Sequence, residues 1–370
     1  MRIVHLTNAY APRSGGVRTT AHALGHGYRA RGHDFVLVVP GAQAMDETHD
    51  WGRLVQVPGP LVPGSGGYRA LVGQDRLWRT VARLAPDRLE VSDRFTLRHL
   101  GPWAREHHVP AVLLAHERLD GVLRAALRLP PAAARAAADR HNRRTAAMFD
   151  AIVATTRFAA GEFDRIGVPT SLVPLGVDLD VFRPPLEPHR RAEDGPLLVL
   201  CGRLSPEKRP DVAVEALRVL RAGGLPARLV VAGDGPARAG LERRARGLPV
   251  TFLGHVTDRG SMAALLGAAD VVLAPGPIET FGLAALEAMA CGTPVVAAAT
   301  SALAELVLQG AGAVAGPTPQ DVAAATAAVL AQPAAAAGRA ARRRAEQFPW
   351  SRTVETMLAV HAGATSGAAR

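Results

Sequence analysis

The sequence predicts an α/β protein made of two doubly wound domains with parallel sheets. Apolar runs of strand length alternate with helical stretches, and this alternation restarts halfway along the chain. A stretch rich in proline, glycine and charge, near residues 176–194, separates the two halves. At 370 residues the chain is also too long for a single ordinary core.

The strands expected in the first half are short and nearly all apolar, which is typical of parallel strands covered on both faces. They are residues 2–6, 35–39, 55–58, 89–91, 111–115 and 151–154. The helices expected between them are 17–31, 97–107 and 132–148.

The second half repeats this pattern. Its expected strands are 197–201, 228–232, 250–253, 271–274 and 294–298, and its helices are 210–221, 237–246, 259–268 and 282–291. An alanine-rich helical segment follows at 322–345. We therefore predict domains over 1–180 and 190–349. Ligands of such sheets bind at the carboxyl ends of the strands, so the strand-to-helix turns are where chemistry is expected.

Composition narrows the class of protein. The formal net charge is +10, but the aromatic content is only 4%, and the basic runs lie in alanine-rich helical sequence without aromatic residues between them. This pattern favours solvated helix faces over a nucleic-acid surface, while an anionic substrate or an anionic membrane remains open. The sequence shows no secretory signal, no apolar run long enough to span a membrane, and two widely spaced cysteines, so we expect a soluble, cytoplasmic protein.

The first turn of interest follows the strand at 2–6. Its Gly15 and Gly16 open a predicted helix, and paired glycines let backbone N–H groups approach an anion at a helix N-terminus. An ordinary tight turn uses the same residues, so the pattern alone is weak. The third glycine of the dinucleotide-binding fingerprint is absent.

The turn after the strand at 197–201 contains Lys208, the only lysine among 43 basic residues. Lysine is a compact, strongly hydrated point charge, whereas arginine is a planar fork. In a chain that uses arginine everywhere else, we interpret Lys208 as a functional position. Arg203 lies in the same turn, and two cations there suit a diphosphate. The alternative is a solvated turn.

The turn after the strand at 271–274 is the most specific. Glu279 precedes the helix predicted at 282–291, and the amides of residues 281–283 form a helix N-terminus that favours a phosphate. Glu287 lies further along that helix, among apolar residues. Because a carboxylate accepts two hydrogen bonds at once, both glutamates suit the paired hydroxyls of a sugar or a ribose.

A fourth candidate is His116, at the carboxyl end of the strand at 111–115, where it could bond a sugar hydroxyl. The chain has 13 histidines, so position alone supports this interpretation. Glu117 and Asp120 lie beside it and could meet a second substrate.

Taken together, these turns resemble the retaining nucleotide-sugar glycosyltransferases of family 4. The resemblance covers nearly the whole chain, and its most specific element is the E-x7-E pattern in ETFGLAALEAMACGTPVV (279–296). The other matching segments are SGGV (14–17), PLGVDLDVFRP (174–184), GRLSPEKRP (202–210), VAGDGP (231–236) and FPWSRTVETML (348–358). The resemblance implies the GT-B fold, in which two Rossmann-like domains face each other across a cleft, and a final helix at 350–370 that packs back onto the N-terminal domain.

The resemblance also implies roles. The implied donor-binding positions are Gly15, Gly16, Arg203, Lys208, Glu279, Thr280, Phe281, Gly282, Leu283 and Glu287. Those at the reacting centre are His116, Arg203, Lys208 and Glu279, and those for the acceptor are Arg18, Glu117 and Asp120. Neither a metal ion nor another cofactor is implied, since the donor phosphate takes the acceptor proton. A nucleotide-sugar donor is the expected partner, nucleic acid is not, and the oligomeric state is left open.

The expected reaction is α-mannosyl transfer from GDP-mannose to a lipid-linked or glycolipid acceptor. The alternatives are a UDP-sugar enzyme acting on a soluble small molecule and a nucleotide-sugar epimerase of the same fold. A basic N-terminal domain with exposed aromatic residues at Tyr68, Trp78 and Trp103 would suit peripheral contact with the anionic inner face of the plasma membrane. The loop at 58–67 is a candidate acceptor loop.

Overall fold

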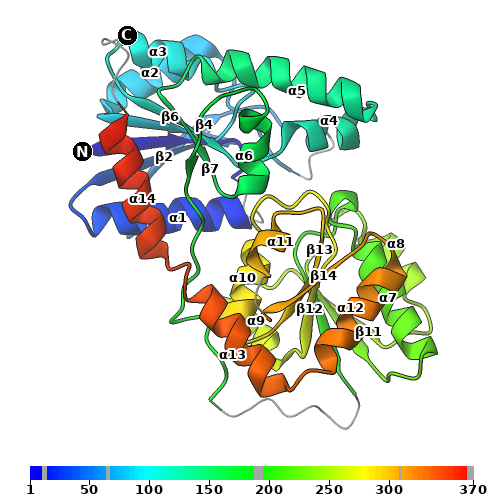
Figure 1. The fold of residues 1–370 in the computed structure, drawn as a ribbon. Coiled ribbons are helices and arrows are strands. Elements are labelled where there is room, and N and C mark those ends of the chain that lie inside the picture. The colour runs from blue at the N-terminus through cyan, green and yellow to red at the C-terminus, as the bar shows by residue number, and fades with distance from the viewer. Residues whose placement is uncertain (11–14, 64–66, 187–194, 308–309, 365–370) are drawn as a thin grey trace. The chain divides into compact units, whose positions relative to one another are not determined.

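The computed structural model describes residues 1–10, 15–63, 67–186, 195–307 and 310–364. The chain divides into two compact units: unit 1 is Met1–Gly176 together with the segment that begins at Trp350, and unit 2 is Val177–Pro349. Each unit holds its own sheet with helices packed against it (Figure 1). The predicted α/β class with parallel sheets is confirmed.

Unit 1 contains an eight-stranded sheet in the order β3-β4-β2-β1-β5-β6-β7-β8. Every neighbouring pair is parallel except β3 and β4. The strands are β1 (Arg2–Leu6), β2 (Asp34–Gly41), β3 (Met45–His49), β4 (Gly52–Pro58), β5 (Arg88–Val91), β6 (Ala111–Ala115), β7 (Ala151–Ala154) and β8 (Ser171–Leu172). The helices are α1 (Gly16–Arg29), α2 (Gln74–Leu84), α3 (Leu100–Glu106), α4 (Leu119–Leu127), α5 (Pro131–Ala146), α6 (Arg157–Asp164) and α14 (Trp350–Gly363).

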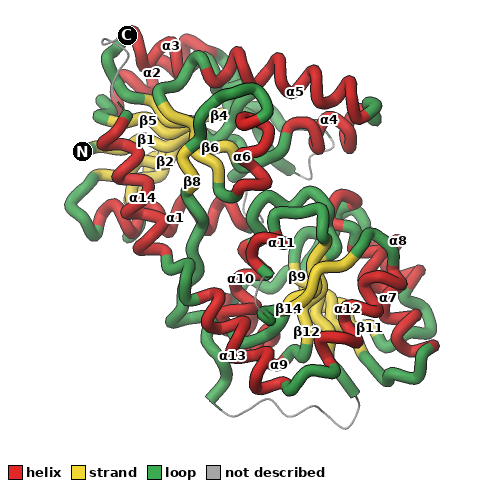
Figure 2. The backbone as a smooth tube through the Cα atoms, in the orientation of Figure 1, coloured by secondary structure: helices red, strands yellow, loops and turns green. Residues whose placement is uncertain are grey.

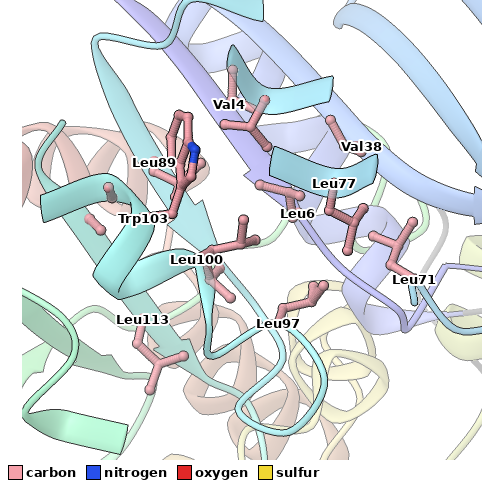
Figure 3. Packing of buried hydrophobic residues seen from close by; sticks show 14 of the residues in the cluster. Val4, Leu6, Val38, Leu71, Leu77, Leu89, Leu97, Leu100, Trp103 and Leu113 are labelled. Carbon is pink, nitrogen blue, oxygen red and sulfur yellow. The ribbon is translucent and has the colours of Figure 1, made fainter. Parts of the chain in front are cut away.

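The central strand β1 builds two cores because successive side chains point to opposite faces of a sheet. Val4 and Leu6 pack on the face covered by α2 and α3 (Figure 3). Ile3 lies on the other face, which α1 and α14 cover. All three side chains are buried.

Trp103 was expected to be an exposed aromatic residue, and this expectation is wrong. Its side chain is only 4% exposed and packs with Leu89 and Leu100 in the first of these cores (Figure 3). Trp78 is partly buried against the same core, and its indole N–H donates to His99. The prediction failed because it relied on the arginines near Trp103 in the sequence. In the structure, Trp103 lies on the face of α3 that packs against the core.

The last helix, α14, belongs to unit 1 although more than 170 residues of unit 2 precede it. It lies beside α1 (Figure 1), and its Val354 and Met357 join Leu24 of α1 in one apolar cluster. A Cβ on Gly27 of α1 would lie 2.2 Å from a methyl carbon of Val354, so only glycine permits this close approach. Residues 365–370 of the predicted final helix lie outside the described residues.

Unit 2 contains a parallel sheet surrounded by helices (Figure 2). The sheet has six strands in the order β11-β10-β9-β12-β13-β14. The strands are β9 (Leu197–Cys201), β10 (Arg228–Ala232), β11 (Val250–Gly254), β12 (Val271–Ala274), β13 (Val295–Ala298) and β14 (Gly312–Ala315). The helices are the short 3-10 helix η1 (Pro206–Lys208), α7 (Pro210–Ala222), α8 (Arg238–Arg244), α9 (Arg259–Ala268), α10 (Leu283–Ala290), α11 (Leu303–Leu306), α12 (Pro319–Leu330) and α13 (Ala334–Ala345).

Both sheets change winding direction at their middle. The neighbours of β1 are β2 and β5, and those of β9 are β10 and β12. At such a switch point the loops leave the carboxyl ends of adjacent strands in opposite directions, which opens a crevice where ligands bind. The predicted site residues lie in the turns that follow β1, β6, β9 and β12 and in the helices that these turns begin.

Several elements differ from the expectation, since the strands β3, β8 and β14 and the helices α2, α4, α6 and α11 were not predicted. The alanine-rich segment forms two helices, α12 and α13, because Pro333 lies between them and cannot continue a helix. The antiparallel edge strand β3 has the sequence MDETH, whose charged residues gave no strand signal. The charged part of the expected linker, at 187–194, lies outside the described residues. Among the residues described, no helix has the length and apolarity needed to cross a membrane.

Candidate functional site

The predicted site residues form two groups, one at the carboxyl ends of the strands of each sheet. Those in unit 2 follow β9 and β12, and those in unit 1 follow β1 and β6. Each group is described within its own unit.

In unit 2 the structure joins two of the predicted residues directly. Lys208 ends η1, and its ammonium donates to the carboxylate of Glu279, which follows β12. Their side chains remain 37% and 23% exposed, so the pair is open to a ligand. The backbone at Gly276 approaches Lys208 so closely that an added Cβ would lie 3.2 Å from the Lys208 Cα. The turns after β9 and β12 are thus packed together.

The backbone around Arg203 is fixed by the neighbouring strand β10. The amides of Gly202 and Leu204 donate to the carbonyls of Ala232 and Asp234, at 3.0 and 2.9 Å. A Cβ on Gly233 would lie 1.9 Å from the carbonyl oxygen of Gly202, so the VAGDGP segment needs its glycine to support this turn. Arg203 itself is exposed.

The N-terminus of α10 is shaped by Gly282, which caps the helix with φ 87°. A side chain there would meet a methyl of Leu303 at 2.3 Å, so glycine is needed for both conformation and space. The first helical bonds are those of the Ala285 and Leu286 amides to the Gly282 carbonyl. The preceding amides of the first turn have no acceptor inside the helix and are oriented to bind an anion. Phe281 is buried, with its ring edge-on to that of Phe348.

Glu287 lies on α10, one helical turn beyond this N-terminus. Burial raises the pKa of its carboxyl to about 7, with Arg259 acting to lower it and Asp178 to raise it. Arg259 is itself paired with Asp178 at 3.1 Å, so its charge is shared. At neutral pH this carboxyl is therefore close to its pKa. Hydroxyl groups that donate to it stabilise the charged carboxylate.

In unit 1, Gly15 caps α1 and Gly16 begins it. A Cβ on Gly15 would meet no atom within 4 Å, so the helix N-terminus is open at this point. Ser14 of the predicted SGGV loop lies outside the described residues. Arg18, in the first turn of α1, places its guanidinium 5.8 Å from the centre of the Tyr10 ring.

His116 lies at the carboxyl end of β6, where its Nε2 is 2.9 Å from the hydroxyl oxygen of Ser92. Burial lowers the pKa of the His116 ring to about 4, so the imidazole is neutral at physiological pH. A cavity of about 330 Å³ opens beside it. Its polar lining includes Asn8, Tyr68, Arg69, Ser92, Asp93, Arg94, Thr96, His116 and Glu117.

The two acidic residues after His116 differ in their surroundings. Glu117 is exposed at the cavity, and its carbonyl accepts from Arg94. Asp120 is 7% exposed and is held by Arg118 at 2.7 Å and Arg165 at 3.4 Å. Glu162 accepts from the amides of residues 119 and 120 and so fixes the start of α4. Asp120 is therefore bound within the unit, whereas Glu117 lines the cavity.

Sequence reasoning missed the side chains behind His116. Ser92 also lies 2.9 Å from His5 Nε2, and His5 Nδ1 lies 2.7 Å from Glu90. Tyr28 and His361 reach the other oxygen of Glu90, each at 2.7 Å. One signal was available in the sequence, namely a glutamate in the middle of the apolar strand expected at 89–91. In the part of the chain that the structure describes, no three His, Cys, Asp or Glu side chains are grouped to hold a metal ion.

Two family models match the chain and together span most of both units. The model described as Glycosyltransferase Family 4 matches residues 14–181, and the model described as Glycosyl transferases group 1 matches residues 195–332.

Among curated proteins, the chain is 49% identical over 367 residues to a GDP-mannose-dependent alpha-(1-6)-phosphatidylinositol dimannoside mannosyltransferase of Mycobacterium tuberculosis. This match covers 97% of the chain and 95% of that protein. A D-inositol 3-phosphate glycosyltransferase of Mycolicibacterium smegmatis is 39% identical over 208 residues, which are 52% of this chain and 46% of that one.

Solved structures share the fold at low sequence identity. Sucrose-phosphate synthase from Thermosynechococcus elongatus superposes with a TM-score of 0.78 at 21% identity, covering 98% of both chains. HepE from Anabaena, in complex with UDP and glucose, gives a TM-score of 0.75 at 18% identity and covers 98% of this chain and 100% of that one.

Proposed function

The chain belongs to glycosyltransferase family 4, with the GT-B fold and a hexosyltransferase activity, and from this membership we propose that it transfers mannose from GDP-mannose to a hydroxyl of a phosphatidylinositol mannoside. The observation that carries the proposal is the 49% identity to a mannosyltransferase of that donor and acceptor class, extending over 97% of the chain. The matched segment includes both groups of site residues.

The Lys208–Glu279 pair is suited to a nucleotide-sugar donor. When the diphosphate binds, the Lys208 ammonium exchanges the carboxylate for a phosphate oxygen, and Glu279 is released to accept hydroxyls of the sugar. Arg203 and the amides at the N-terminus of α10 add positive potential for the diphosphate. These groups stabilise the charge that grows on the departing GDP.

The remaining residues have complementary proposed roles. Glu287 accepts the two ribose hydroxyls, and Gly15 and Gly16 allow backbone approach to the diphosphate. His116 meets a hydroxyl of the mannose. The acceptor oxygen bonds to the anomeric carbon, the bond from that carbon to the phosphate breaks, and the phosphate takes the acceptor proton. Attack on the face that the phosphate leaves retains the α configuration.

We further propose that this chemistry uses no bound metal ion, because Arg203 and Lys208 supply the positive charge that the leaving diphosphate requires. The measurement is the initial rate in excess EDTA, which we expect to equal the untreated rate. A rate lost to EDTA and restored by Mg²⁺ would contradict this.

The cavity beside His116 suits the polar head of the acceptor. Next to it, the segment that follows β4 exposes Leu61, Val62 and Val72, with exposed fractions of 57%, 41% and 39%. We propose that these side chains contact acyl chains and hold the protein peripherally on a membrane. Residues 64–66 of the predicted acceptor loop lie outside the described residues. We expect Leu61→Asp to reduce sedimentation with phosphatidylinositol vesicles several-fold, whereas the matched Leu172→Asp, at an exposed position on β8, leaves it unchanged.

The direct test is transfer by the purified protein. We expect radiolabelled mannose to pass from GDP-mannose to phosphatidylinositol dimannoside, and His116→Ala to lower that rate at least tenfold. In a thermal-shift panel GDP should stabilise the protein more than UDP or ADP. Stabilisation by UDP alone would support a UDP-sugar enzyme, and donor turnover without any acceptor would support an epimerase.

A further inference from the structure

A continuous chain of hydrogen bonds links His116 to the interior of unit 1. It runs from His116 Nε2 to the Ser92 hydroxyl at 2.9 Å, from Ser92 to His5 Nε2 at 2.9 Å, and from His5 Nδ1 to Glu90 at 2.7 Å. His5 is 1% exposed and Glu90 is fully buried. The two are register partners on adjacent strands, with His5 on β1 and Glu90 on β5.

The buried end of the chain is an anion. Burial opposes the charge of Glu90, but the hydrogen bonds from His361 and His5 outweigh burial and hold the pKa of Glu90 far below its usual value. Tyr28 adds a third donor at 2.7 Å, and burial together with the charge of Glu90 raises the Tyr28 pKa well above its usual value. Because a carboxylate only accepts, His5 carries a proton on Nδ1.

This anion determines the direction of every bond that follows. When Nδ1 holds the single ring proton of His5, Nε2 is unprotonated and accepts from the Ser92 hydroxyl. A hydroxyl has a single proton, so the Ser92 oxygen then accepts from His116, whose Nε2 must carry the proton. Nδ1 of the neutral His116 ring is consequently the unprotonated, accepting nitrogen.

We propose that Ser92, with His5 and Glu90 behind it, is a positioning device that selects the Nε2–H tautomer of His116. The proposal rests on the function of His116 at the donor sugar, because that tautomer makes Nδ1 an acceptor for a substrate hydroxyl.

A purely structural role does not account for the whole chain. Tyr28 on α1 and His361 on α14 attach both covering helices to Glu90, and this attachment requires neither Ser92 nor His116. Burial is the main cause of the lowered His116 pKa; His5 and Arg94 act in the same direction, and Glu90 acts to raise it. Tyr28 and His361 contact Glu90 itself.

The first test reads the tautomer without any enzymatic assay. In the protein labelled with ¹⁵N-histidine, nitrogen–proton correlation spectra near pH 7.5 should show His116, identified by its loss in His116→Gln, with a protonated Nε2. In Ser92→Ala we expect the Nδ1–H form to appear, and in Ser92→Thr the wild-type pattern to return. An unchanged His116 tautomer in Ser92→Ala would overturn the proposal.

The second test reads function through kcat and KM. Ser92→Ala should lower kcat about tenfold with KM for GDP-mannose within twofold, because His116 stays in place but is no longer held in the Nε2–H form. Ser92→Thr should restore kcat. Tyr28→Phe is the matched control: it removes a Glu90 partner outside the chain, so it should lower Tm but leave kcat unchanged. A kcat lowered equally by Tyr28→Phe and Ser92→Ala would overturn the proposal.

The two tests also separate this inference from the proposed function. A tautomer that shifts in Ser92→Ala while kcat and the activity of His116→Ala stay at wild-type levels would support the positioning device and refute the role of His116 at the sugar. A loss of activity in His116→Ala with no tautomer shift in Ser92→Ala would refute the positioning device alone.

Discussion

Two glutamates at the switch points of the two sheets have opposite surroundings. Glu279 in unit 2 is partly exposed and pairs with one ammonium, that of Lys208, which is also partly exposed. Glu90 in unit 1 is fully buried and accepts from His5, Tyr28 and His361. An exposed pair can exchange partners with a ligand at little cost, whereas a buried anion fixes the positions and protons of its neighbours. The exposed pair of Glu279 and Lys208 therefore suits ligand binding. The buried Glu90 suits holding neighbouring side chains in fixed positions before a ligand binds.

The largest expected effect is on stability and tests the buried member of this comparison. Glu90→Ala leaves three buried donors without an acceptor, so we expect the free energy of unfolding to fall by about 3–5 kcal/mol. Glu279→Ala should cost under about 1 kcal/mol, because its pair is exposed to solvent. Urea denaturation of both variants measures the difference. Equal losses would show that burial does not distinguish the two glutamates.

The second prediction concerns activity, which should depend strongly on the exposed pair even though that pair contributes little to stability. Lys208→Ala should lower kcat/KM for GDP-mannose about a hundredfold, or about 2.7 kcal/mol, since a charged contact to the leaving diphosphate is lost. Its Tm should change little. Lys208→Arg keeps the charge but not the shape and should recover only part of the rate. The matched control is Arg218→Ala, an exposed cation on α7, which should retain wild-type activity.

The third prediction concerns the backbone that supports the exposed pair. Gly282 and Gly224 both have φ 87°, but a Cβ would contact Leu303 at 2.3 Å in the first and nothing within 4 Å in the second. Gly224→Ala should therefore cost about 1 kcal/mol of unfolding free energy from strain alone, and Gly282→Ala about 2–3 kcal/mol. Only Gly282→Ala should also weaken GDP binding in a titration. Equal costs at the two positions would exclude the contact with Leu303 as the cause.

The smallest expected effect is on the pH dependence of stability. The folded-state pKa of Glu287 is raised from its ordinary 4.5 to about 7. Ionisation thus costs stability in the folded protein: the penalty grows from pH 4.5 to 7 and is complete above 7. In the absence of ligand, Glu287→Gln should be more stable than wild type by about 1–2 kcal/mol at pH 8, allowing for its partial exposure, and equal to it at pH 4.5.

The measurement is urea denaturation at several pH values, with Glu355→Gln, at an exposed position on α14, as the control for the chemical change. A Glu287→Gln difference that does not vary with pH would contradict the raised pKa.

Much of the fold could be predicted because local signals and tertiary packing agree. The apolar strands β1, β6 and β9 were predicted at their observed positions, since a strand covered on both faces leaves a continuous apolar run. The edge strand β3 was not predicted, because its residues are exposed and polar and only pairing with β4 holds them extended. Trp103 was wrongly predicted to be exposed, because its charged neighbours in the sequence do not reveal which face of α3 packs against the core.

The site divides in the same way. Lys208 and Glu279 were predicted because each lies in a short turn with distinctive residues, and the structure joins them in one ion pair. Ser92, His5, Tyr28 and His361 were not found, since each looks ordinary in its own segment. They come together only through strand register and the return of α14 to unit 1.

The sequence by itself thus determined the α/β class, the strand-to-helix turns that carry charge, and the single lysine among 43 basic residues as a functional candidate. Tertiary structure alone decided that Glu90 is buried and that hydrogen bonds connect it to His116 through His5 and Ser92. The physical reason is the separation along the sequence over which each kind of interaction acts. Turn chemistry and apolar periodicity act between residues a few positions apart, whereas a hydrogen-bond network depends on which distant strands and helices the folded sheet makes neighbours.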